Sequence, residues 1–129
     1  MKTEKNKTKE TKGTREIKVI DASGRTLGRV ASEVAMSLMG KTKATFERNK
    51  YSGFPVKVIN ASKLRITAKK LEVIYHQRYS GMRGGRRVIT GTETAEKKGL
   101  KELVKLATFQ MLPDNKLRRV MMKHLTIVD

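Results

Sequence analysis

The residues between a predicted strand and the helix that follows it are the first whose types could do chemistry. The segment 21–29 reads DASGRTLGR, and at such a junction nucleotide-binding proteins hold phosphate against the free amides of a helix N-terminus. A Rossmann loop needs Gly-x-Gly-x-x-Gly, and a P-loop ends in Gly-Lys-Ser/Thr. Here three residues separate Gly24 from Gly28, and Arg29 follows, so neither nucleotide motif is present. Arg25 and Arg29 instead favour a large, exposed polyanion as the ligand.

A second candidate is the window between Glu72 and Glu93, which contains no acidic residue. Glycines there let backbone amides approach phosphate oxygens. Arginines offer planar donors for phosphate or for stacking on unpaired bases, and a tyrosine adds another stacking surface. Lys69 and Lys70 precede the window and extend its charge. The alternative is a solvated loop whose charges do little. The window contains Arg78, Tyr79, Arg83, Arg86 and Arg87, with His76 and glycines at 81, 84 and 85.

Two further basic segments lie at predicted helix ends. No acid occurs between Asp114 and Asp129, so the outward faces of the last predicted helix carry one sign of charge. A charged outer face is also ordinary for a surface helix. The end of the first predicted helix is followed by cations, which the helix dipole favours there. The predicted RNA contacts in these segments are Lys41, Lys43, Lys116, Arg118, Arg119 and Lys123.

Residues for catalysis or metal binding are scarce. The chain has no Cys and 2 His, which excludes disulfides, thiolate zinc sites and cysteine nucleophiles and disfavours a histidine metal centre. His76 has no carboxylate or nucleophile placed beside it by local spacing, and a histidine that hydrogen-bonds locally is the simpler interpretation. We therefore expect no catalytic residue, no metal, no cofactor and no small-molecule substrate.

The overall charge points to the class of partner. The 129 residues include 30 Lys and Arg against 12 Asp and Glu, a formal net charge of +18, and nucleic acid is the usual partner of such a surface. An anionic membrane would favour a basic amphipathic helix with bulky aromatics, but aromatics are 5% and Trp is absent. No apolar run approaches membrane-spanning length, and the N-terminus has no hydrophobic signal segment. We expect a cytoplasmic protein without a membrane partner.

Hydrophobic periodicity gives the elements that must position these residues. Residues 1–14 are predicted to be a flexible basic tail, either an unimportant extension or an arm that contacts phosphate. Residues 15–129 are predicted to form one α/β domain, with a parallel strand pair joined by a right-handed crossover. We expect strands at 17–21, 54–59, 64–67, 73–75 and 126–128, helices at 27–38, 92–98, 100–111 and 117–125, and a loop at 80–87.

Several motifs together resemble a known family. The run VIDASGRTLGRVA at 19–31 is similar to the opening signature of the large-subunit ribosomal protein L-thirteen family, bacterial type. The likeness continues through GKTK, VINA, IT, SGMRGG, MLP and NKL, and covers about residues 15–129. Departures include Tyr79 where the family has a histidine, His76 and Gln77 in place of tyrosines, and Gln110 and Arg118 in place of glycines.

The resemblance implies a fold, a role and partners. The fold would be a three-layer α/β/α arrangement with a small, mainly parallel sheet. The protein would be a structural constituent of the large ribosomal subunit that binds large-subunit rRNA, enters assembly early and contacts neighbouring ribosomal proteins. Two other functions stay open from the residues alone: a small nucleotide-dependent enzyme that uses the 21–29 turn, and an RNA-binding regulator outside the ribosome.

Overall fold

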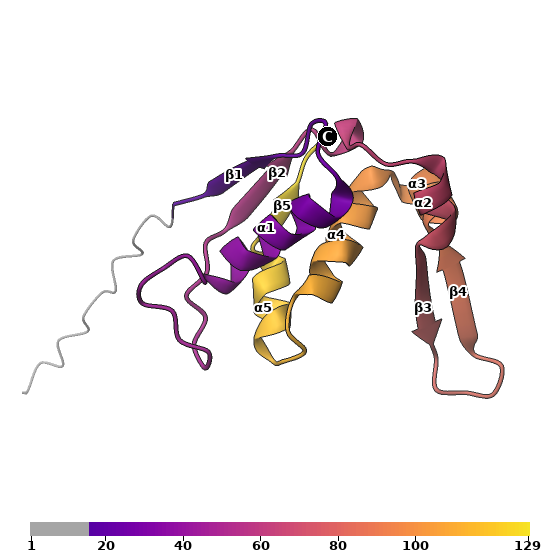
Figure 1. Cartoon of the computed structure of the whole chain (residues 1–129). Coiled ribbons are helices and arrows are strands. Elements are labelled where there is room, and N and C mark those ends of the chain that lie inside the picture. Colours follow the sequence, from indigo (N-terminus) through magenta and orange to yellow (C-terminus); the bar gives the residue numbers. More distant parts are fainter. Residues whose placement is uncertain (1–15) are drawn as a thin grey trace, which may run out of the picture.

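The computed structural model describes residues 16–129, so the predicted tail at 1–14 lies outside the described residues. The chain alternates strands with helices and adds a separate hairpin (Figure 1). The element order is β1 (Lys18–Asp21), α1 (Leu27–Met39), β2 (Val56–Ile59), the 3-10 turn η1 (Ala61–Lys63), α2 (Ala68–Val73), β3 (Tyr75–Tyr79), β4 (Arg86–Thr90), α3 (Gly91–Lys98), α4 (Leu100–Met111), α5 (Leu117–Lys123) and β5 (Leu125–Ile127).

The main sheet consists of three parallel strands in the order β1-β2-β5. Its register aligns Ile20 with Val58 and Val58 with Ile127. Two neighbouring parallel strands need a long crossover connection between them. Between β1 and β2 this connection contains α1, whose apolar stripe packs in the core. The predicted parallel pairing and the mixed α/β class with a small parallel sheet are confirmed.

The hydrophobic core lies between one face of this sheet and the helices. Ile20, Val56 and Val58 alternate along the strands with exposed residues and are buried. They join the buried stripe of α1 and residues of α4 and α5, including Leu103 and Met121. α1 packs most extensively against α4, and the two helices lie side by side in Figure 1. The opposite face of the sheet carries Val19, Lys57 and Thr126, whose side chains are exposed.

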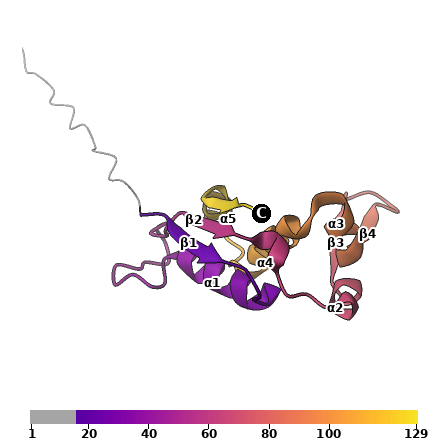
Figure 2. The same cartoon turned by 90° about the horizontal axis from the view of Figure 1, so that it is seen from above.

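The β3–β4 hairpin projects from the body at the end of the molecule away from β1 (Figures 1 and 2). It corrects two sequence predictions. The expected loop at 80–87 is shorter, because Arg86 and Arg87 belong to β4, and the strand expected at 73–75 begins only at Tyr75, since Val73 ends α2. Both hairpin strands are exposed along most of their length, so neither shows the apolar alternation that marks a half-buried strand.

Other predicted elements need smaller corrections. Residues 64–67 form no strand; they are a connection in which Arg65 donates its backbone N–H to the Arg25 carbonyl at 3.0 Å. The last helix ends at Lys123 rather than 125, because Leu125 already begins β5. The helix predicted at 92–98 begins one residue earlier, at Gly91.

Gly40 ends α1 in a conformation that other residues adopt with strain. Its φ is 77°, and an added Cβ would lie 2.9 Å from the Ser52 carbonyl. We expect Gly40→Ala to lower the free energy of unfolding by about 1–3 kcal/mol. The matched variant Gly28→Ala, in the first turn of α1 with nothing within 4 Å of the new methyl, should instead raise it by up to about 1 kcal/mol. Urea unfolding of the free protein measures both, and equal effects would contradict this interpretation.

Candidate nucleic-acid interface

The first group of cations lies where the parallel strands end. The backbone N–H of Gly24, after β1, donates to the Lys63 carbonyl, after β2, at 3.0 Å. With the Arg65–Arg25 backbone bond, this brings together residues from two loops. Ligands of open α/β sheets bind at this carboxyl edge. We call Arg25, Arg29, Lys63 and Arg65 the sheet-edge group.

Within this group, Arg25 forms an ion pair with another residue of the same chain. Its Nη2 lies 2.7 Å from Glu33 Oε2 on α1, and both side chains are partly exposed. The remaining N–H groups of a guanidinium can still reach a phosphate. Arg29, in the first turn of α1, is exposed, and so are Lys63 and Arg65.

The turn that positions Arg25 is fixed by Asp21. Its Oδ1 accepts a hydrogen bond from the Ser23 backbone N–H at 3.0 Å and another from Asn60 Nδ2 at 3.0 Å. Asn60 comes from the end of β2, where its φ is 58°. The bond from Ser23, followed by the bond from Asn60, lowers the pKa of the Asp21 carboxyl below its ordinary value of 3.8.

The Asp21 contacts give a pH dependence with a definite sign. A carboxyl whose pKa is lowered by folding stabilises the native state above its unfolded pKa, and this contribution is lost as the pH falls from about 4 through the folded pKa. We expect an NMR titration of the folded protein to place the Asp21 midpoint below 3.8. Asn60→Ala should move the midpoint upward, because one donor to the ionised form is removed. A midpoint at or above 3.8 in the unsubstituted protein would contradict the assignment.

The second group surrounds the end of α1. The loop that follows α1 and the turn between α4 and α5 both line one pocket, and the cations of the loop that line it are Lys41, Arg48 and Lys50. Lys43 Nζ lies 3.8 Å from the centre of the Phe54 ring, a cation–π contact. Lys116 is exposed on the same α4–α5 turn. We call Lys41, Lys43, Arg48, Lys50 and Lys116 the helix-end group.

The third group is the β3–β4 hairpin. Arg78 pairs directly with Arg87, and Tyr79 pairs with Arg86. Like charges placed opposite one another on adjacent strands destabilise a sheet, so a bound anion would stabilise this arrangement. Arg83 is exposed in the connecting turn. We call Arg78, Tyr79, Arg83, Arg86 and Arg87 the hairpin group.

The predicted cationic side chains on α2 and α5 differ in their exposure and in the contacts that they already make within the protein. Lys69 and Lys70 are exposed on α2, which leads directly into the hairpin. Arg119 and Lys123 are exposed on α5. Arg118, in contrast, forms an ion pair with Asp114 at 2.9 Å, donates to the Pro113 carbonyl and lies over the Phe109 ring. Through these three contacts the guanidinium of Arg118 stabilises the α4–α5 turn, so its role is structural.

Sequence reasoning missed five residues that belong with these groups. Lys63 and Arg65 join Arg25 only through the crossover, which no local pattern shows. Arg48 and Lys50 join Lys41 only through the fold of the loop. Tyr75 lies on the same face of β3 as Tyr79, because side chains two or four residues apart on a strand share a face. The tyrosines are 57% and 65% exposed, and an assigned strand at 75–79 would have identified the pair.

In residues 16–129 no group of three or more His, Asp or Glu side chains is arranged to hold a metal ion. None of the helices in that range is long and apolar enough to cross a bilayer. His76 lies on β3, and its Nδ1 is 3.5 Å from Gln110 Nε2 on α4. This contact joins distant segments and is not the local hydrogen bond that the sequence suggested.

Comparison with known proteins decides what this arrangement of basic groups belongs to. The family model for ribosomal protein L13 matches residues 15–129. The chain belongs to the ribosomal protein L13 family. Similar proteins include the large ribosomal subunit protein uL13 of Clostridioides difficile, 40% identical over 109 residues that cover 84% of this chain and 76% of the relative. The uL13 protein of Geobacter sp. (strain M21) is 41% identical over 127 residues, which cover 98% and 87% of the two chains.

Family membership confirms the resemblance seen in the motifs. The ribosomal protein L13 family is one of structural constituents of the large ribosomal subunit and is not an enzyme family. Its bacterial members are cytoplasmic components of the ribosome, which confirms the expected location and the association with translation.

Proposed function

We propose that this protein binds large-subunit rRNA and joins the subunit early in its assembly, beside neighbouring ribosomal proteins. The family match over residues 15–129 carries the proposal. The three basic groups support it, because they lie at separate places on one small domain: the carboxyl edge of the sheet, the end of α1 and the hairpin. A ligand that meets all three must be large and anionic.

The mechanism is electrostatic. Lysines and arginines that neutralise phosphates release condensed counterions, which favours binding in a salt-dependent way. Phosphate contacts at several places on one rigid scaffold bring distant RNA strands together and lower the cost of folding them. The site residues of this mechanism are those predicted from the sequence, with Arg48, Lys50, Lys63, Arg65 and Tyr75 added. Arg25 and Arg118 act mainly by holding the loops that carry their neighbours.

Sedimentation tests the proposed location. In a sucrose gradient of cell lysate at moderate salt, we expect the protein to migrate with large ribosomal subunits, and ultraviolet crosslinking of those fractions should join it to rRNA. Protein that stays at the top of the gradient, or crosslinks only to messenger RNA, would contradict the proposal and favour a regulator outside the ribosome.

A further inference from the structure

We propose that the pocket at the end of α1 receives an unpaired nucleobase of the bound RNA, with the adjoining phosphates held by Lys41 and Arg48. This inference rests on the proposed rRNA binding and adds to it a site that reads a base. We call this cavity the methionine pocket. It is lined by three methionines and by other apolar residues together with cations, principally Met39, Met111, Met121, Phe46, Lys41 and Arg48.

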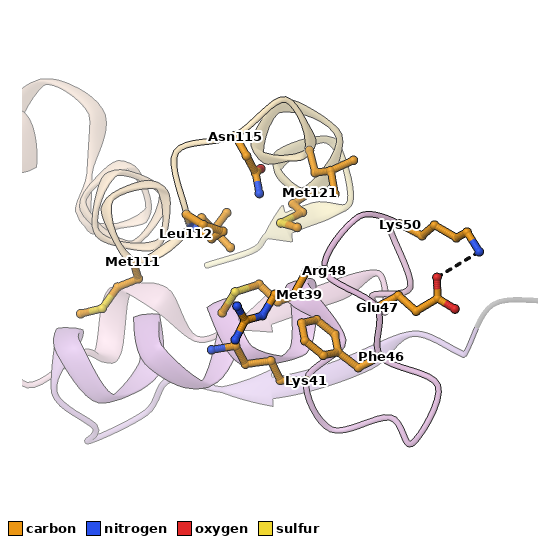
Figure 3. A pocket seen from close by; sticks show the side chains of 12 residues that line it. Met39, Lys41, Phe46, Glu47, Arg48, Lys50, Met111, Leu112, Asn115 and Met121 are labelled. Carbon is orange, nitrogen blue, oxygen red and sulfur yellow. Dashed lines mark ion pairs between the residues drawn. The ribbon is translucent and has the colours of Figure 1, made fainter.

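The size and walls of the methionine pocket suit a flat ring. Its volume of about 480 Å³ falls within the range of sites for small organic ligands. Figure 3 shows Met39 and Phe46 on one side and Leu112 and Met121 on the other, with Met111 at one end. Methionine sulfur interacts favourably with the edges and faces of aromatic rings, and an aromatic side chain such as Phe46 offers a face on which a base can stack.

The charges at the mouth indicate which occupant fits. The one carboxylate among the lining residues is Glu47, and Lys50 Nζ already lies 3.0 Å from its Oε2. In residues 16–129, neither Lys41 nor Arg48 has a carboxylate within the 4.0 Å of an ion pair. The mouth is therefore cationic around an apolar interior. A nucleotide is complementary to both parts, since its base is flat and weakly polar and its phosphate is anionic.

An apolar side chain of a neighbouring protein would fill the same interior but would leave the two cations without a counter-charge. Lys116 lies between Asn115 and Leu117 of the lining, and Lys43 follows Lys41 by two residues. These cations also favour RNA, because the strand that carries the base would meet them on leaving the pocket. We therefore assign the methionine pocket to RNA, and protein occupancy is an outcome of the test.

The test compares RNA with and without the base. The probes are ribo-octamers that are abasic at every position except one central position, which carries either 2-aminopurine or no base, so that the phosphates are identical and only one probe has a base to offer. Because stacking of one base contributes about 1–3 kcal/mol, we expect the base to strengthen binding at 50 mM salt by about 5- to 150-fold. We also expect 2-aminopurine fluorescence to be quenched in the complex.

A pocket-filling variant supplies the specific control. Met111 is 48% exposed at one end of the pocket, so Met111→Trp should fill it without disturbing the fold. We expect this variant to lose the base-dependent gain and the quenching while its binding to abasic RNA stays unchanged. Met36→Trp, at a methionine that is 45% exposed on α1 and outside the pocket, should keep both.

Two results would overturn the assignment: no base-dependent gain in the unsubstituted protein, or a gain that survives in Met111→Trp. Neither result touches the proposed function, because the protein would still migrate with large subunits in the gradient. Loss of that migration would reject rRNA binding itself, whatever the octamers do.

Discussion

Replacing Arg78, Arg83, Arg86 and Arg87 together by glutamine should weaken binding to large-subunit particles by about 10³-fold, taking roughly 1 kcal/mol for each lost charge-assisted contact. All four side chains are exposed, and glutamine keeps much of their size, so the fold should persist. The free protein should even become slightly more stable, because the Arg78–Arg87 pair no longer places like charges opposite one another. Binding of purified protein to particles that lack it, measured at 100 mM salt, gives the affinity.

A matched variant separates position from total charge. Lys18, Lys57, Lys101 and Lys105 lie on β1, β2 and α4, outside the three groups, and Lys101 pairs with Asp129 and Lys105 with Glu102. Replacing these four by glutamine removes the same charge from elsewhere on the surface. We expect a loss of at most about tenfold, as from long-range attraction alone. Equal losses in the two variants would show that only net charge matters and would contradict a binding role for the hairpin.

Leu103→Ala should lower the free energy of unfolding by about 2–5 kcal/mol, a large fraction of what a domain of this size possesses. Leu103 lies on α4, is 1% exposed and belongs to the core between α1, α4 and the sheet. Truncation leaves a cavity that neighbours cannot fill. Chemical unfolding of the free protein measures the loss.

Val73→Ala is the control for Leu103→Ala, because Val73 at the end of α2 is 74% exposed. Its substitution should change stability by less than about 0.5 kcal/mol. If the two variants were equally stable, the assignment of Leu103 to the core would be wrong. Leu103→Ala that remains folded should still bind rRNA, since no cation of the three groups is altered.

The predictable parts of the fold are those in which one face of a strand or helix is buried, because apolar residues then recur at regular intervals in the sequence. Ile20, Val56 and Val58 alternate with exposed neighbours, and the buried positions of α1 recur every three or four residues. The sequence of the β3–β4 hairpin shows no such period, because both strands are exposed along most of their length. α2 has six residues and none of them is buried, so it shows no apolar stripe.

The candidate interface was predictable in composition but not in arrangement. Segments without acids identify the cations, since a one-sided charge is a local property. Long-range contacts decide which cations act together, and these depend on the crossover that brings Lys63 beside Gly24 and on the loop that brings Arg48 to α1. The Arg25–Glu33 and Arg118–Asp114 ion pairs likewise required the folded helices and turns.

The dependence of binding on salt tests most directly whether the cationic surface meets RNA phosphates. The measurement is the affinity of the full chain for large-subunit particles that lack it, at several salt concentrations. If about six to ten phosphates are neutralised, raising the salt from 50 to 200 mM should weaken binding by roughly 10³–10⁵-fold, and log K should fall linearly with log salt. An affinity that stays constant over this range would contradict the account.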